Sequence, residues 1–251
     1  MKKKFNLFIL TFCMLWFSGI CFSETKEFVI GVEDLEYFPH YTHDGEYYKG
    51  YAREFFDNFA KQKGYVIQFK ILPVKRLFKE FLDGIIDFKY PDNPYWQQDL
   101  KKGKTIHYTN SVAEYIDGIM VLTENKGAGL DKLKILGTMR GFTAWDYLDL
   151  INSEKIKLNE NNTFTGLLQQ IILKRIDGAY VNVAVAKYQL NEFLKRPGSL
   201  VFDANLPHTK GSYLCSSIKY PEIIQEINNF LTENKTFIDE LKKKYQIDVI
   251  E

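Results

Sequence analysis

The sequence predicts an α/β protein of two lobes, each with a mainly parallel sheet flanked by helices. Short apolar runs typical of buried strands alternate with longer segments whose apolar residues recur at helical spacing. This alternation begins twice along the chain, so two α/β halves of roughly a hundred residues each are expected. The sequence contains no internal repeat of fixed period and no low-complexity tract.

The first half has the order strand, helix, strand, helix, strand. Glycines and prolines mark its boundaries: Gly64 and Gly84 end the two helices, and Pro91–Pro94 is expected to form a turn. The expected strands are Phe28–Val32, Val66–Leu72 and Asp87–Tyr90, and the expected helices are Tyr51–Lys63 and Leu77–Leu82.

The second half repeats this rhythm and ends in two amphipathic helices. The expected strands are Ile116–Leu122, Lys134–Gly137, Gly178–Asn182 and Ser212–Ser217. The expected helices are Thr143–Ile151, Thr165–Lys174, Val183–Leu194, Pro221–Leu231 and Phe237–Tyr245. Parallel strands joined by helices are the arrangement that this order favours.

The N-terminus predicts export. Lys2–Lys4 form a positive start, and an almost wholly apolar run follows from Phe5 to Phe22. This layout is typical of a secretory signal peptide, so we expect cleavage after Ser23 and a mature protein in the periplasm. A retained membrane anchor is an alternative, because the run is near the lower limit for a spanning helix. A lipoprotein is a weaker alternative, because Ile20 stands where lipoproteins usually have a small residue before the cysteine, here Cys21.

The composition limits the length of the mature chain, its classes of binding partner and its disulfides. Removing residues 1–23 from the 251 leaves 228, enough for one large domain or two small lobes. The removed segment holds three lysines and no acid, so 33 basic against 32 acidic residues becomes 30 against 32. A near-neutral chain without a basic block argues against nucleic acid. Cys215 is the one cysteine left, so no internal disulfide is expected.

Four local segments in this order resemble the type II periplasmic solute-binding proteins, in particular the family 3 group that delivers polar amino acids and related solutes to ABC importers. The resemblance covers essentially the whole mature chain. The segments are Gly31–Tyr51 with its Tyr37-Phe38-Pro39 step, Leu82–Asp87, Leu136–Thr143, and Leu173–Tyr180 with Arg175 where glycine is usual.

The resemblance implies a two-lobed fold with two crossover hinge segments, near Tyr108–Ile119 and Val201–Tyr213. Lobe 1 would comprise residues 24–111 and 206–251, and lobe 2 residues 112–205. A small polar solute would bind in the cleft between them. The implied partners are the membrane subunits of an ABC importer or a sensor receptor. A monomer without a cofactor is expected.

Two departures from the family concern the ligand. Amino-acid-binding members usually hold the α-carboxylate with an arginine shortly after the third strand, but Tyr90–Gln98 contains no arginine. They usually hold the amino group with an aspartate where this chain has Asn182. A carboxylate without a bidentate guanidinium lacks its best partner. We therefore expect a ligand other than a standard amino acid held by that clamp.

Arg140, Phe142 and Thr143 are the first candidate ligand-binding residues, because they end an expected strand and open an expected helix. The free N–H groups of a helix start attract anions. Thr143 as a plain helix cap and Arg140 as a solvated cation remain the alternative. Arg76, just after another strand, is the candidate substitute for the missing arginine, with a surface salt bridge as its alternative.

Tyr90, Asp92, Asn93 and Trp96 form a polar and aromatic loop. Its rings could stack on a ligand and Asp92 could pair with an amine. The alternative is a proline-bounded turn in which Asp92 and Asn93 bond their own backbone. Among the aromatic residues of the first loop, Tyr37 is expected in the cleft.

An enzyme on the same scaffold is the alternative function. Cyclohexadienyl dehydratases resemble this family and would need a general acid in the cleft, for which Asp34, Glu36 and Asp92 are available. The sequence shows no catalytic constellation, so no enzyme is predicted and Asp34 is assigned to ligand binding. A metal site is not predicted either, because the spacing of His40, His43, Asp44 and Glu46 is loose.

Overall fold

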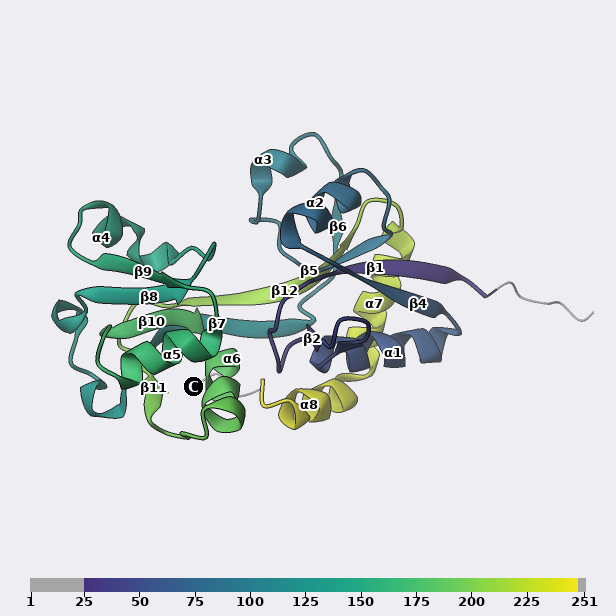
Figure 1. Ribbon diagram of the computed structural model, residues 1–251. Helices are drawn as coiled ribbons and strands as arrows, with labels where there is room; N and C mark the ends of the chain where they lie inside the picture. The colour runs from purple at the N-terminus through teal and green to yellow at the C-terminus, as the bar shows by residue number, and fades with distance from the viewer. Residues whose placement is uncertain (1–24, 248–251) are drawn as a thin grey trace, which may run out of the picture.

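The computed structural model describes residues 25–247, in two lobes that lie side by side (Figure 1). The expected signal peptide, residues 1–23, lies outside the described residues. Within residues 25–247, no helix combines the length and the apolar character that crossing a membrane requires.

Lobe 1 contains a parallel sheet with β1 (Glu27–Glu33) between β4 (Val66–Leu72) and β5 (Phe88–Asp92). A two-residue strand, β6 (His107–Tyr108), pairs with β12 (Thr209–Ser217). β2 (Thr42–His43) and β3 (Tyr48–Lys49) form a small hairpin. The helices of this lobe are α1 (Tyr51–Lys63), α2 (Val74–Leu82), α3 (Gln98–Lys101), α7 (Pro221–Glu233) and α8 (Lys235–Lys244).

Lobe 2 contains β8 (Ile135–Met139) in parallel between β9 (Lys157–Asn161) and β10 (Gly178–Asn182). β11 (Leu200–Phe202) pairs with β7 (Ala113–Leu122). Its helices are α4 (Leu148–Asn152), α5 (Phe164–Ile172) and α6 (Val183–Tyr188), which continues as a π-helical segment, Gln189–Phe193. Short 3-10 turns cover Thr123–Asn125, Leu130–Lys132 and Trp145–Tyr147.

Two long antiparallel strands join the lobes. β7 (Ala113–Leu122) and β12 (Thr209–Ser217) pair with each other, and β12 also pairs with β5 in lobe 1 while β7 pairs with β10 in lobe 2. The strand order is therefore β4-β1-β5-β12-β7-β10-β8-β9, one continuous path through both lobes (Figure 1). The residue boundaries expected for the lobes stay a prediction.

Aromatic side chains make up much of the lobe 1 core. On α1, Phe55, Phe56 and Phe59 share one face and are at most 1% exposed. Phe55 meets Phe230 of α7 edge to face, with ring centroids 5.5 Å apart. Burying each such ring contributes roughly 1.5–3 kcal/mol, so the helical spacing of these residues fixes α1 and α7 against the sheet.

Three expected elements differ from the structure. No helix begins at Thr143. Arg140 and Gly141 (φ 82°) form a turn, residues 142–144 have no regular structure, and the α-helix starts only at Leu148. Pro91 and Asp92 belong to β5 rather than to a turn. The helix expected from Val183 to Leu194 widens into a π-helix at Gln189. The sequence analysis also missed β9, a mostly polar strand.

Candidate functional site

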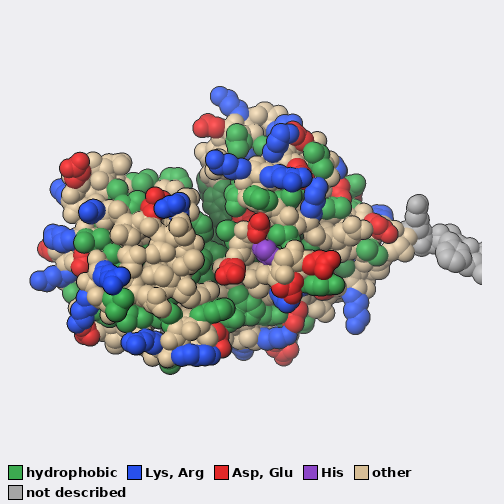
Figure 2. Space-filling view, in the orientation of Figure 1, with side chains coloured by type: hydrophobic (Ala, Val, Ile, Leu, Met, Phe, Trp, Pro, Cys, Tyr) green, Lys and Arg blue, Asp and Glu red, His purple; other side chains and the backbone are tan. Residues whose placement is uncertain are grey.

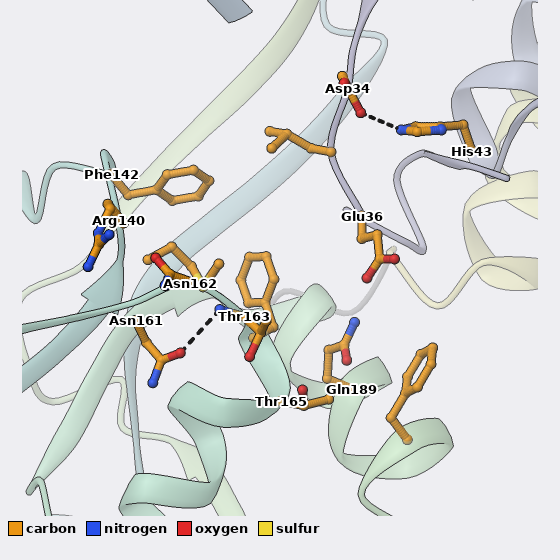
Figure 3. A pocket seen from close by; sticks show the side chains of 14 residues that line it. Asp34, Glu36, His43, Arg140, Phe142, Asn161, Asn162, Thr163, Thr165 and Gln189 are labelled. Carbon is orange, nitrogen blue, oxygen red and sulfur yellow. Dashed lines mark hydrogen bonds and ion pairs between the residues drawn. The ribbon is translucent and has the colours of Figure 1, made fainter. Parts of the chain in front are cut away.

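A cavity of about 710 Å³ lies between the two lobes, within the range of roughly 300–1,000 Å³ that is usual for ligand pockets. The molecule is hollowed between the lobes, and Figure 3 shows the side chains that line the cavity (Figures 2 and 3). They are Asp34, Leu35, Glu36 and His43 from lobe 1, and Met139, Arg140, Phe142, residues 161–165, Gln189 and Phe193 from lobe 2.

The cavity lies where the parallel strands end. Asp34–Glu36 follow β1, Arg140–Phe142 follow β8, and Asn162–Thr165 lead from β9 into α5. Loops at the carboxyl ends of parallel strands converge on one edge of a sheet, which is the usual place for a ligand. The backbone N–H of Arg140 donates to Asn161 O at 2.8 Å and so holds the two lobe 2 loops together.

The lobe 1 wall is acidic. His43 Nε2 lies 2.7 Å from Asp34 Oδ1, and the N–H of Gly45 donates to His43 Nδ1 at 3.0 Å. Because Nδ1 accepts, the ring proton belongs on Nε2, which donates to Asp34. Glu36 makes no hydrogen bond or ion pair with any described residue, and its carboxylate points into the cavity (Figure 3).

The lobe 2 wall contains the N-terminus of α5. Thr163 caps this helix, since its Oγ1 accepts from Gly166 N at 3.1 Å, and Asn161 Oδ1 accepts from Thr163 N at 3.1 Å. The N–H groups of Phe164 and Thr165 then have no intrahelical acceptor. Arg140 is exposed and forms no ion pair within residues 25–247. This wall can therefore hydrogen-bond an anion.

Three candidate residues from the sequence line this cavity: Asp34, Arg140 and Phe142. Tyr37 lies behind it, 4% exposed, with its ring 6.2 Å from that of Phe142 and 5.7 Å from that of Phe164. Thr143 is exposed and is not among the lining residues, because the expected helix start is absent.

Arg76 does not line the cavity. Its guanidinium is exposed on α2 and its Nε donates to Glu80 at 2.7 Å, one helical turn away. Lys70 pairs with the same carboxylate at 2.7 Å, and these two cations lower the pKa of Glu80. The surface salt bridge is therefore the observed role, and Arg76 does not occupy the place of the missing arginine.

Tyr90 and Asp92 are fully buried inside lobe 1 and do not line the cavity either. Asp92 accepts from Lys101 Nζ at 2.8 Å and from Ser216 Oγ at 2.7 Å, and Lys89 Nζ lies 3.4 Å away. Burial lowers the pKa of Lys101. This buried charge cluster anchors the end of β5 and the loop after it.

Asn93 and Trp96 lie in that loop, above the charge cluster. Asn93 Nδ2 donates to Ser212 O at 3.2 Å and its Oδ1 accepts from Tyr95 N at 3.0 Å. Trp96 meets Tyr213 of β12 edge to face, with centroids 6.1 Å apart. Both side chains therefore fasten the loop to the strand that joins the lobes, and neither lines the cavity.

Asn182, the last candidate, is buried at the junction of the lobes. Its Oδ1 accepts from Val185 N at 3.1 Å, which caps α6, and its Nδ2 lies 3.4 Å from the Tyr213 hydroxyl. Burial raises the pKa of the neighbouring Asp117 to about 7 and lowers that of His40 to about 3. Oδ1 of Asp117 and both ring nitrogens of His40 are buried without a hydrogen bond of good geometry.

Sequence reasoning missed part of the site. Glu36 had been considered only as an acid for catalysis, and residues 161–165 and Gln189 were not singled out. The Thr163 cap before an apolar helix is a recognisable signal that could have located the start of α5. Gln189 carries no such signal, because its position depends on a π-helical turn inside an expected α-helix.

Among residues 25–247, no group of three or more His, Cys, Asp or Glu side chains could hold a metal ion. The loose grouping of His40, His43, Asp44 and Glu46 therefore does not assemble into such a site. His40 is buried, with 1% exposure.

No family model matches the chain, and no curated protein matches it. Solved structures do. Substrate-binding domain 2 of Lactococcus lactis GlnP, in an open conformation, is 15% identical, with a TM-score of 0.65 over 91% of this chain and 98% of that chain. The ancestral amino acid-binding protein AncCDT-1, a precursor of cyclohexadienyl dehydratase, is 17% identical, with a TM-score of 0.64 over 87% and 94%.

A histidine kinase sensor domain with similarity to periplasmic binding proteins is 17% identical, with a TM-score of 0.66 over 88% of this chain and 96% of that chain. At such identities the likeness shows the fold alone.

Proposed function

Because the chain has the two-lobed fold of type II periplasmic binding proteins, we propose that it is an exported protein that captures a small polar solute in the interlobe cleft. The solute would be delivered to an ABC importer or reported to a receptor. The observation that supports this most is the cavity of about 710 Å³, which both lobes line with loops from strand ends. The similar structures include a substrate-binding domain and a histidine kinase sensor domain.

The lobes would close on the solute by bending at β7 and β12. These two strands join residues 24–111 and 206–251 to residues 112–205, the division that we propose for the lobes. Two strands that cross between packed bodies make a natural hinge. Binding to the closed form would stabilise the folded protein by mass action.

The usual amino-acid clamp is not expected to operate here. The Tyr90–Gln98 segment contains no arginine. The buried cations on either side of it in the sequence, Lys89 and Lys101, are engaged by Asp92 and by backbone oxygens. Asn182 caps α6 in the place where an aspartate would hold an amine. The solute is therefore one that other residues of the cleft recognise.

An enzyme of the cyclohexadienyl-dehydratase type is the alternative. It would need a proton donor in the cleft, and Glu36 is the unpaired carboxyl there. His43 already uses both ring nitrogens, toward Asp34 and Gly45, so no free base stands beside Glu36. Binding without turnover is therefore the first choice.

Calorimetry with the standard amino acids, followed by small-angle scattering with a bound solute, tests the proposal. We expect weak or no binding of most standard amino acids and a more compact particle at saturation with the true solute. Submicromolar binding of several amino acids would show that the clamp inference is wrong. An unchanged scattering profile at proven saturation would contradict closure. Product formation from a cyclohexadienyl substrate would favour the enzyme.

A further inference from the structure

The Gln189 side chain is held in the cavity without a hydrogen-bond partner among residues 25–247. It is 5% exposed, and its amide makes no hydrogen bond to any described side chain or backbone group. Its side chain points from the lobe 2 helix toward the cavity, on the side where Glu36 faces it from lobe 1 (Figure 3). A buried amide without hydrogen-bond partners destabilises the folded protein unless solvent or a bound ligand forms hydrogen bonds with it.

A local irregularity gives Gln189 this position. α6 ends at Tyr188, and Gln189 is the first residue of the π-helical segment Gln189–Phe193. Single π-turns inside helices are rare and occur often at functional sites. Phe193, in the same segment, also lines the cavity although 59% of it remains exposed. The irregular turn thus directs two side chains to the cleft.

The charges that line the cavity are divided between the lobes. Lobe 1 contributes Asp34 and Glu36 and no Lys or Arg, whereas lobe 2 contributes Arg140 and no Asp or Glu. Glu160 accepts from Gly141 N at 3.3 Å near the lobe 2 wall but is not a lining residue. The free N–H groups at the start of α5, a helix of nine residues, add to the positive side.

We propose that the cleft selects a dipolar solute in a fixed orientation. The amine or guanidinium end faces Asp34 and Glu36 of lobe 1, and the carboxylate or other anionic end faces Arg140 and the start of α5 in lobe 2. The Gln189 amide binds a polar group between the two ends. This orientation is the reverse of the usual family clamp, in which lobe 1 supplies the cation, and it rests on the proposed solute-binding function.

The two walls belong to different lobes of a cavity of about 710 Å³, and probes of increasing length measure which separation of opposite charges the cleft prefers. A solute that forms charge-assisted hydrogen bonds to both lobes would stabilise the closed form of the protein.

Calorimetry on the mature, exhaustively dialysed protein tests this with defined probes. The dipolar probes are the ω-amino acids from β-alanine to 6-aminohexanoate, and the controls are the alkylamine and the alkyl carboxylate of the same chain length. At least one dipolar probe should bind tenfold or more tightly than both of its controls, about the effect of one charged hydrogen bond.

Single variants then assign the two ends. Glu36→Gln should weaken the best dipolar probe and its amine analogue roughly tenfold and leave the carboxylate analogue unchanged. Arg140→Gln should do the reverse. Gln189→Leu should leave these probes unchanged, because their methylene chains carry no polar group between the two ends, and should weaken a probe of the same length that has a hydroxyl there. Matched exposed variants, Glu124→Gln, Arg175→Gln and Gln225→Leu, should bind as the wild type does.

Binding of a single-charge control as tightly as its dipolar partner would overturn the inference. So would unchanged binding in both Glu36→Gln and Arg140→Gln. If an uncharged or singly charged solute binds and compacts the particle, the proposed solute-binding function survives and the dipolar inference fails. If no probe binds and no solute is carried through native purification, both fail.

Discussion

His40 and Asp117 are buried beside the same side chain, Asn182, and burial shifts their pKa values in opposite directions. The pKa of His40 falls to about 3, and that of Asp117 rises to about 7, with Asp146 adding to the rise. Both groups therefore stay neutral over most of the acidic range. They lie at the junction of the lobes, where β7 and α6 meet the first loop of lobe 1.

The two shifts give the free energy of unfolding opposite pH dependences. His40 stabilises the folded state least at low pH, because the unfolded chain gains a proton below about 6.5 that the folded state refuses until about 3. Asp117 acts the other way, because the unfolded chain loses its proton from about 3.8 upward while the folded state keeps it until about 7. Between pH 4 and 6.5 the two pH dependences largely cancel, although both groups lower the stability there.

Asp117→Asn should uncover the His40 contribution. The variant removes the cost of keeping Asp117 protonated, so its free energy of unfolding should exceed that of the wild type above pH 7, by up to about 4 kcal/mol. Below pH 4 the two proteins should converge. Urea unfolding at several pH values measures this, and an equal pH dependence in both proteins would refute the assigned shift.

His40→Gln should uncover the Asp117 contribution. Stability should then fall as the pH rises from about 4 to about 7, the opposite slope to that of Asp117→Asn. The lost edge-to-face contact with Tyr213, at 5.1 Å between centroids, lowers stability by an amount that does not vary with pH. The slope is therefore the diagnostic quantity, and a slope equal to that of the wild type would count against the account.

Asp92→Asn should destabilise lobe 1 strongly. The substitution leaves Lys89 and Lys101 buried without their shared anion, and breaking a buried ion pair in this way costs roughly 3–5 kcal/mol. Denaturant unfolding measures the change. Asp83→Asn is the control, because its partner Lys79 is exposed, and an Asp92→Asn variant as stable as this control would contradict the burial of the cluster.

Arg76→Ala should leave solute binding within about twofold of the wild type, since an exposed ion pair contributes little. Glu80 keeps Lys70 as a partner, so stability should change little as well. Calorimetry with the solute that the wild type binds decides the matter. A tenfold loss in Arg76→Ala would place Arg76 in the site after all.

Local pattern was enough to locate many elements. Three elements have the limits expected from the sequence: Tyr51–Lys63, Val66–Leu72 and Gly178–Asn182. The spacing of apolar residues within each segment is enough to indicate a helix or a strand. The turn at Gly141 was not expected from the sequence. It depends on hydrogen bonds between distant segments, such as the one that Arg140 N donates to Asn161 O.

The candidate site was predictable only in part, for the same reason. Arg140 and Phe142 lie next to a strand end, and that position indicated the cleft. Asp92 has an equivalent position, yet Lys101 and Ser216 surround it from outside the local segment and take it into the core. A polar residue that follows a strand can lie in the cleft or in the core. Its hydrogen-bond and ion-pair partners determine which, and its position in the sequence does not.

Native mass spectrometry of the natively purified protein tests the central claim, that the interlobe cleft holds a solute. The wild type should carry one small molecule per chain. Thr165→Trp, which fills the cavity beside the start of α5, should lose it, and the exposed helix variant Thr232→Trp should retain it. A wild type without any bound solute, or a Thr165→Trp variant that keeps it in the same proportion, would contradict the account.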